Sequence, residues 1–342
     1  MQADTQPLVS VVIPCYNEEE AIGQVLEALA DQSYPLSRLE VLVVDGMSTD
    51  ATRMQIAGFR ARRPDLSVRV IDNPRRAIPT AMNLGIAQAR GEYVVRMDAH
   101  ARPSPDYVAR CVALLQAGAG DNVGGRWLIE PGAGTHLAKA IALAVSHPFG
   151  IGDALYRYAQ RAAYVDTVPF GAFRRDLFKR VSVYDEQLLS NEDYDLNYRI
   201  RKAGGRIFFS PDIHCTYYAR RTLGALARQY FRYGWWKVRM LRKYPAAIRW
   251  RQLVPPAFVA GLLGLGVLAG LVPGMGWAWL VLVAVYLLIS GSVALRLARR
   301  RGAGWRVAAW LLAAFATIHL SWGIGFWASL PGALASRPLS RG

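Results

Sequence analysis

The stretch that organises the chain runs from Glu92 to His100 and reads EYVVRMDAH. The apolar run from Tyr93 to Met97 predicts a buried strand that delivers Asp98 and His100 into a loop. A carboxylate and an imidazole two residues apart in an extended turn can both bind one divalent cation, which keeps open positions for diphosphate oxygens. The alternative is a strand end at which Asp98 caps the following turn. The surroundings of the stretch must decide between the two.

Composition limits the classes of protein to which the chain can belong. With 342 residues it is long enough for one large domain and an appendage, and 53% of the residues are hydrophobic. The apolar excess is concentrated between about 253 and 330, and the preceding part has a globular composition. The formal net charge of +16 favours nucleic acid, an anionic membrane surface or phosphorylated ligands as partners. No basic run is interleaved with aromatic residues as in nucleic-acid modules, so we expect a membrane partner and no nucleic acid.

The cysteines indicate the redox compartment. Cys15, Cys111 and Cys215 are widely spaced, odd in number and flanked by apolar residues, which is typical of reduced core thiols in a cytosol-facing domain. The first eight residues have no basic start and no apolar run, so no signal peptide is expected.

Before Asp98 the chain alternates between apolar runs and amphipathic segments. Strands are expected at about 8–13, 40–44 and 67–71, and helices at about 17–29, 51–63 and 78–89. This alternation predicts an α/β fold, with a parallel sheet and helices on both of its faces. Asn17, followed by three glutamates, is the expected N-cap of the first helix.

Polar clusters follow three of these strands. Asn17 and Glu18 come after the first, Asp45 after the second, and Asp98 and His100 after the stretch quoted above. In parallel α/β sheets the ligand binds beyond the carboxyl ends of the strands. Three clusters at one edge therefore favour a binding site over solvated loops.

After residue 106 the alternation loosens. We expect a helix at about 105–117, a strand at 122–129, an apolar amphipathic segment at 135–148, and a strand with a tight turn at 166–172. A further helix starts at Ser190 and ends near Lys202. Glu192 and Asp193 at its N-terminus could complement the helix dipole or take part in catalysis, and the local sequence leaves both interpretations open.

The C-terminal part contains three apolar stretches, at 253–272, 274–295 and 307–330. Each is long enough to cross a hydrocarbon core of roughly 30 Å. The basic island from Arg296 to Arg306 places the second connection in the cytoplasm by the positive-inside tendency, so three crossings would put the C-terminus outside. Arg337 and Arg341 argue against the third crossing. His319 within that stretch could be functional, but neighbouring small residues favour helix packing.

These patterns predict four parts: a cytosolic catalytic domain (1–225), a juxtamembrane segment (226–252), about three transmembrane helices (253–332) and a tail (333–342). The juxtamembrane segment combines aromatic and basic residues, which is typical of an interfacial helix and also suits the phosphate groups of a lipid. We therefore expect a multi-pass protein of the inner (plasma) membrane with a cytoplasmic catalytic domain.

Two segments, VSVVIPCYNEE at 9–19 and VVDGMSTD at 43–50, resemble the opening of family 2 glycosyltransferases of the GT-A fold. Within that family, RMDAHA at 96–101, NEDYD at 191–195 and QYFRYG at 229–234 are similar to bacterial exopolysaccharide transferases of the ExoA (succinoglycan) type. The resemblance covers nearly the whole chain. It implies a GT-A, Rossmann-like mixed sheet with helices on both faces, followed by an all-α transmembrane segment.

The resemblance also implies roles for individual residues. The nucleotide sugar would contact Pro14, Tyr16, Glu18, Asp45, Arg76 (or its neighbour Arg75), Asp98, Gln229 and Arg232. Asp45 would hold the uracil or ribose end, and Asp98 and His100 would bind Mn²⁺ or Mg²⁺, with His100 where the family has a second Asp. Asp193 would be the general base, with Glu192 beside it and Arg232 near the diphosphate.

The implied reaction is an inverting, metal-dependent hexosyl transfer from a UDP-sugar to a lipid-linked (polyprenyl diphosphate) saccharide, in exopolysaccharide or cell-envelope glycan synthesis. One alternative is a polyprenyl-phosphate sugar synthase, whose ionised acceptor needs no general base. Another is a non-catalytic membrane scaffold that binds nucleotide sugars. A processive synthase with its own channel is disfavoured because three spans are too few.

Overall fold

The computed structural model describes residues 6–335, so Arg337 and Arg341 and most of the expected tail lie outside the described residues. The chain divides into two compact units. The first consists of Met1–Leu128 and Leu155–Tyr217, and the second of Ile129–Ala154 and Tyr218–Gly342. The segment from Ile129 to Ala154 thus groups with the C-terminal helices, whereas the functional bounds expected from the sequence stay predictions.

A mixed sheet forms the centre of the first unit. Its strands are β1 (Val9–Cys15), β2 (Leu39–Asp45), β3 (Ser67–Asp72), β4 (Tyr93–Arg96), β5 (Arg102–Pro103), β6 (Asn122–Glu130), β7 (Ala163–Tyr164), β8 (Ala172–Arg174) and β9 (Ile207–Tyr218). Their order is β3-β2-β1-β4-β8-β6-β9-β5, with β7 paired to β9. The pairs β1–β2, β1–β4 and β2–β3 are parallel, whereas β8 is antiparallel to β4 and to β6. The expected mixed sheet is therefore confirmed.

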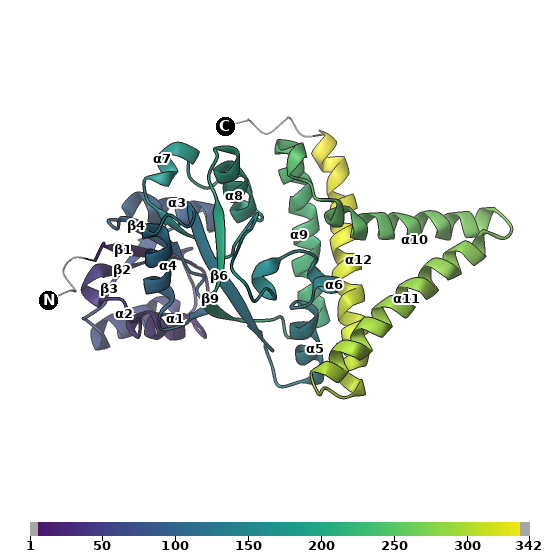
Figure 1. Ribbon diagram of the computed structural model, residues 1–342, viewed down its shortest axis with the longest axis horizontal. Coiled ribbons are helices and arrows are strands. Elements are labelled where there is room, and N and C mark those ends of the chain that lie inside the picture. The colour runs from purple at the N-terminus through teal and green to yellow at the C-terminus, as the bar shows by residue number, and fades with distance from the viewer. Residues whose placement is uncertain (1–5, 336–342) are drawn as a thin grey trace. The chain divides into compact units, whose positions relative to one another are not determined.

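Helices cover both faces of the sheet, as the alternation predicted. They are α1 (Ile22–Ala30), α2 (Thr52–Arg62), α3 (Ile78–Gln88), α4 (Tyr107–Gln116), α7 (Leu177–Val181) and α8 (Glu192–Lys202). Short 3₁₀ turns occupy Leu36–Arg38, Leu155–Arg157, Pro245–Ala247 and Trp250–Leu253. The ribbon is drawn in Figure 1.

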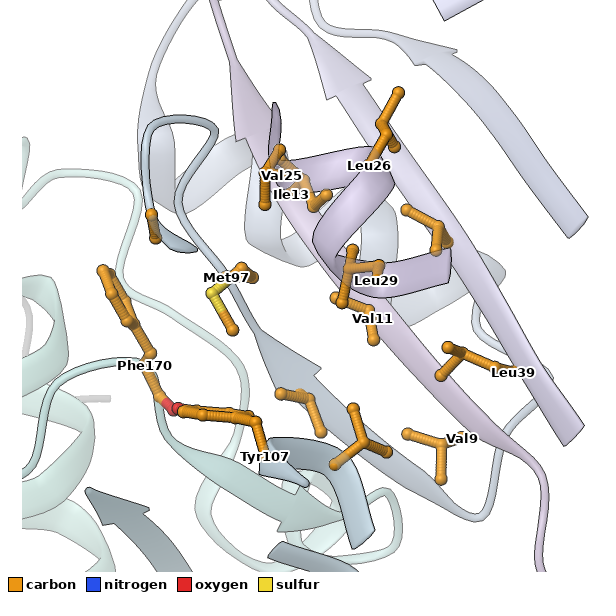
Figure 2. Close-up of a cluster of buried hydrophobic side chains, with 14 of the residues drawn as sticks. Val9, Val11, Ile13, Val25, Leu26, Leu29, Leu39, Met97, Tyr107 and Phe170 are labelled. Atoms are coloured by element: carbon orange, nitrogen blue, oxygen red, sulfur yellow. The ribbon is translucent and has the colours of Figure 1, made fainter. Parts of the chain in front are cut away.

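Successive residues of β1 point to opposite faces of the sheet and so belong to two different cores. Val11 lies in the cluster that also contains Leu29 of α1 and Tyr107 of α4, which Figure 2 shows. Val12 lies in the cluster that contains Met82 of α3 and residues of α8. Because both faces of β1 are buried, its sequence is apolar apart from Ser10, as is usual for parallel strands between helices.

Two local predictions are wrong. Asn17 does not cap a helix, because α1 begins at Ile22 and Asn17 has a positive φ of 52°. The Asn17 side chain instead accepts a hydrogen bond from the Thr49 amide at 2.9 Å, which ties two loops together. The strand expected at 166–172 is also absent from the described residues: β8 begins only at Ala172, and Phe170 has φ 45°.

The second unit is helical over most of its length. It contains α5 (His136–Ala144), α6 (Pro148–Ile151), α9 (Leu223–Lys243), α10 (Val254–Leu271), α11 (Met275–Arg300) and α12 (Trp305–Ala335). Within residues 6–335, three helical segments are long and apolar enough to cross a membrane: Trp250–Leu271, Met275–Arg300 and Trp305–Pro331. These correspond to the three apolar stretches of the sequence.

The contact between α3 and β1 generates a stability prediction. A Cβ atom on Gly85 would lie 2.3 Å from Cγ1 of Val12, whose backbone is fixed in the centre of the sheet. We expect Gly85→Ala to destabilise the protein by about 1–3 kcal/mol through overpacking. The matched change Gly58→Ala in α2 places its Cβ only near the flexible end of Arg62 and should stabilise by up to about 1 kcal/mol. Denaturant unfolding of both variants checks this, and a Gly85→Ala variant as stable as the wild type would contradict it.

Candidate functional site

The loops that follow β1 and β2 are held together by hydrogen bonds. The Gly46 amide donates to the Cys15 carbonyl at 2.7 Å, and the Glu18 amide donates to Thr52 Oγ1 at 2.8 Å. The Asn17 amide donates to Ser48 Oγ at 2.9 Å. The loops after these two strands therefore form one continuous surface at the carboxyl edge of the sheet.

Asp45 is fully buried beneath that surface. Its carboxylate accepts hydrogen bonds from the Ser48 amide at 3.1 Å, from Ser48 Oγ at 2.5 Å and from Arg53 Nε at 2.5 Å. Arg53 also pairs with Asp72 at 2.6 Å, so one guanidinium connects the ends of β2 and β3. In this geometry Asp45 shapes the loop that follows β2. Its expected contact with the nucleotide stays a prediction.

Tyr16 and Arg76 form an exposed pair at the same edge. The Arg76 guanidinium lies 5.2 Å from the centre of the Tyr16 ring, and 41% of Tyr16 is exposed. Arg75 points elsewhere and pairs with Glu186 at 2.5 Å. The structure therefore brings Arg76, the residue chosen from the sequence, beside Tyr16. Pro14 lies half-buried in β1 opposite Val44.

A single buried guanidinium, that of Arg96, forms ion pairs with three carboxylates at the end of β4. Arg96 is 5% exposed, and its Nε lies 3.2 Å from Asp98 Oδ1. Its Nη1 donates to Glu192 Oε1 at 3.1 Å and also to Asp193. Arg96 thus joins Asp98, which follows β4, to the first turn of α8. It brings three of the predicted site residues into one cluster.

The acidity of Asp193 is altered by this environment. Burial raises the pKa of Asp193 to about 7, the carboxylates of Glu192 and Asp98 add to the rise, and Arg96 opposes it. About one third of the side chain, 32%, is still exposed. Asp193 is therefore a carboxyl group that titrates near neutral pH and that a ligand can reach, as a general base requires.

His100 connects the end of β4 to the loop that follows β1. Its Nδ1 lies 3.0 Å from Glu18 Oε1, and the Ala101 amide donates to the Asp98 carbonyl in the turn between the strands β4 and β5. Nitrogen and carboxylate donors suit Mn²⁺ and, less well, Mg²⁺. Within residues 6–335 no three His, Cys, Asp or Glu side chains are grouped so that they could hold a metal by themselves. The residues fit a cation that takes its remaining ligands from the phosphates of its substrate and from water.

Gln229 and Arg232 lie on α9, in the second compact unit. The Gln229 side chain donates to Tyr233 Oη at 3.1 Å, and Arg232 is exposed. Their assignment to the diphosphate stays a prediction.

Sequence reasoning missed Arg96 and Arg53. An arginine inside the apolar run YVVRM was an available signal, because a buried guanidinium requires acidic partners. Arg53 gave no such signal, since it lies on a helix whose other arginines are exposed.

A mixed sheet with acidic side chains beyond its parallel strands is the architecture of nucleotide-sugar-dependent glycosyltransferases of the GT-A fold. The mannosyltransferase PcManGT from Pyrobaculum calidifontis shares this fold, with a TM-score of 0.56 and 22% identity over 97% of this chain and 87% of that chain. TarS residues 1–349 from S. aureus give a TM-score of 0.52 at 18% identity, over 95% and 92% of the two chains.

The model of Glycosyl transferase family 2 matches residues 10–182, and the chain belongs to this family. It is similar to the succinoglycan biosynthesis protein ExoA of Rhizobium meliloti (strain 1021), with 33% identity over 94% of each chain. A dolichyl N-acetyl-alpha-D-glucosaminyl phosphate 3-beta-D-2,3-diacetamido-2,3-dideoxy-beta-D-glucuronosyltransferase of Methanococcus voltae is 28% identical over 75% of this chain and 80% of that protein. The expectation of a family 2 glycosyltransferase is confirmed.

The carboxylate cluster predicts the effect of removing its cation. We expect Arg96→Met to destabilise the protein by about 3–5 kcal/mol, because uncompensated carboxylates would remain buried. Arg96→Lys, which keeps the charge, should cost less. The matched control is Arg174→Met, which removes an exposed arginine from two carboxylates and should cost about 0–1 kcal/mol. Unfolding measurements check the difference, and equal losses for Arg96→Met and Arg174→Met would refute it.

Proposed function

We propose that this glycosyltransferase moves a hexose from a UDP-sugar to a lipid-linked saccharide, with inversion at the anomeric carbon. The observation that carries the proposal is the continuity of the carboxyl edge. The loop after β1, which we propose for the nucleotide, contains Glu18, and Glu18 lies against His100. Asp98 is connected to Asp193 through the guanidinium of Arg96. A donor that extended along this edge would bring its sugar to the carboxylates at the start of α8.

The reaction needs one proton acceptor and a way to neutralise the leaving group. Asp193 removes the proton from the acceptor hydroxyl as that oxygen forms a bond to the anomeric carbon of the donor sugar. The bond from this carbon to the diphosphate oxygen breaks on the opposite face, and the diphosphate takes both bonding electrons. Arg96 fixes the orientation of the base. Arg232 is the cation proposed for the diphosphate.

A divalent cation is part of the proposal. Asp98 and His100 would hold it, and when bound it would neutralise charge on the departing diphosphate. Support comes from the donor set described above and from PcManGT, which was solved in complex with GDP-Man and Mn²⁺. TarS was solved with UDP-GlcNAc, so the two structural neighbours differ in the nucleobase of their donors, and the donor panel below includes both nucleotides.

The proposed acceptor and location depend on the C-terminal helices and on the relatives. The R. meliloti relative is named for succinoglycan biosynthesis, and the M. voltae relative for a dolichyl phosphate-linked substrate. Among the described residues, three helices are long and apolar enough to cross a bilayer. We propose a multi-pass protein of the plasma membrane whose catalytic unit faces the cytoplasm. There it would meet a polyprenyl-diphosphate-linked saccharide in exopolysaccharide or envelope glycan synthesis.

Donor turnover tests the proposal directly. Purified protein in detergent is incubated with Mn²⁺ or Mg²⁺ and a panel of UDP-, GDP- and dTDP-sugars, and release of the nucleotide diphosphate is measured. We expect metal-dependent release from a UDP-sugar and its loss, by about 100-fold or more, in Asp98→Ala. Failure to bind any nucleotide would sink the proposal. Tight binding without turnover, even with lipid acceptors present, would support the scaffold alternative.

The pKa of Asp193 predicts the pH dependence. Above about pH 7 the carboxylate is ionised and can accept a proton, so transfer should slow as the pH falls through this value. Asp193→Asn should lower kcat by about 10²–10⁴-fold and abolish this dependence.

A polyprenyl-phosphate sugar synthase would behave differently, because its phosphate acceptor is already ionised. A dodecaprenyl-phosphate galacturonate synthase of Rhizobium johnstonii is 35% identical over 32% of this chain, which makes the comparison necessary. If Asp193→Asn transferred to polyprenyl phosphate at nearly the wild-type rate, this second function would replace the first.

A further inference from the structure

The helix α9 is strongly basic and runs alongside α12 (Figure 1). It contains six basic residues and no acidic one: Arg228, Arg232, Lys237, Arg239, Arg242 and Lys243. Arg228 and Arg232 are exposed. In the part of the chain that the structure describes, the apolar partner α12 is one of three helices long and apolar enough to cross a bilayer. A basic helix is thus packed along a candidate span.

The contact between α9 and α12 is a close approach of backbones. A Cβ atom on Gly234 of α9 would lie 2.1 Å from the carbonyl oxygen of Trp322, and one on Gly325 of α12 would lie 2.2 Å from that of Phe231. Tyr230 shares a buried cluster with Phe315. These contacts lie in the middle of both helices, so α9 packs against the central turns of α12.

The helices α5 and α6 also contact α12. Phe149 packs edge-on against Phe315 with 4.9 Å between ring centres, and the Phe149 carbonyl lies 2.8 Å from His319 Nε2. Tyr286 Oη lies 3.0 Å from His319 Nδ1, so both ring nitrogens have partners and the packing role expected for His319 is supported. In the most apolar part of α12, 39% of the residues are buried, against 11% in α10 and α11.

These neighbours would have to accompany α12 into the hydrocarbon. In hydrocarbon no water is present to hydrogen-bond the backbone N–H and C=O groups that lie outside regular helices. Placing a cationic side chain at the centre of a bilayer also costs free energy. Crossing would bring the middle of α9, with Arg228 and Arg232 exposed, to that depth. It would also bring in the connection between α5 and α6. The packing of α12 is that of a helix outside the hydrocarbon core.

Within residues 6–335, the helices α10 and α11, unlike α12, have no basic helix packed along them and are mostly exposed in their apolar parts. Between Arg251 and Arg296 the chain has no Asp, Glu, Lys, Arg or His. With 18 and 26 residues, α10 and α11 measure about 27 Å and 39 Å. Basic residues flank the pair at both ends: Arg249 and Arg251, which bind Asp153, precede α10, and Arg299 and Arg300 end α11. By the positive-inside tendency both ends of the pair lie on the same side of a membrane.

We propose that the α10–α11 hairpin alone crosses the bilayer, while α9 and α12 lie at its surface, where basic side chains meet anionic lipid phosphates. The chain then crosses twice, and its C-terminus lies on the same side as its N-terminus. This replaces the three crossings expected from hydropathy. It rests on the proposed membrane location. Wild-type protein extracted from membranes by carbonate would overturn that location, whereas the labelling results below concern the number of crossings.

Cysteine labelling of the full chain in intact cells and in inverted vesicles tests the topology. The native Cys15, Cys111 and Cys215 are buried and give the background of the wild type. Single reporters are Gly276→Cys near the tip of the hairpin, Gly304→Cys between α11 and α12, and Ser340→Cys near the C-terminus. The open space around the first two makes these changes mild. The probe is a membrane-impermeant maleimide.

We expect Gly304→Cys and Ser340→Cys to react only from the cytoplasmic side and Gly276→Cys only from the opposite side. Reaction of Gly304→Cys and Ser340→Cys from opposite sides would show that α12 crosses. If Gly276→Cys reacted from the cytoplasmic side, or from neither side, the hairpin would not cross.

A charge substitution provides an independent readout. Leu263 in α10 is 65% exposed and Ile324 in α12 is 47% exposed. We expect Leu263→Arg to lower the carbonate-resistant protein several-fold and Ile324→Arg to leave it near the wild-type level. Comparable losses for the two variants would contradict the proposal.

Discussion

The guanidinium of Arg96 is the constraint on which the candidate site depends. A buried cation needs compensating charge, and Arg96 obtains it from Asp98 on its own strand and from Glu192 and Asp193 at the start of α8. The two segments are nearly one hundred residues apart in sequence. The ion pairs therefore do more than offset desolvation, because they fix where the first turn of α8 stands relative to the end of β4.

This arrangement explains how acidic residues with different tasks can share one small volume. Without the guanidinium, three carboxylates this close would favour protonation or would separate. With it, the Asp98 carboxylate has an ion-pair partner, while burial raises the pKa of Asp193 and makes it a stronger base than an ordinary aspartate. The sequence separation of the partners is bridged by the sheet order, which places β8 beside β4 and brings the chain back toward α8.

Much of this could be predicted because the signals were local. Apolar runs located β1, β2 and β4, and the polar residues at the end of each predicted the edge at which the structure places the candidate site. What failed depended on distant partners. Asn17 is a residue type that often caps helices and precedes three glutamates, but its side chain accepts a hydrogen bond from the Thr49 amide in the loop instead. The number of membrane crossings stays a prediction, and our proposal for it also depends on distant partners, because hydropathy describes α12 alone and contains no information about the basic helix that packs on it.

The contact between Glu18 and His100 makes the two halves of the candidate site thermodynamically dependent. Glu18 belongs to the loop proposed for the nucleotide, and His100 to the pair proposed for the cation. A ligand that moves Glu18 changes the surroundings of the imidazole. Linkage then requires reciprocity: a nucleotide that tightens cation binding by some factor has its own affinity raised by the same factor. Cation and donor affinities measured separately would therefore not describe the enzyme when both are bound.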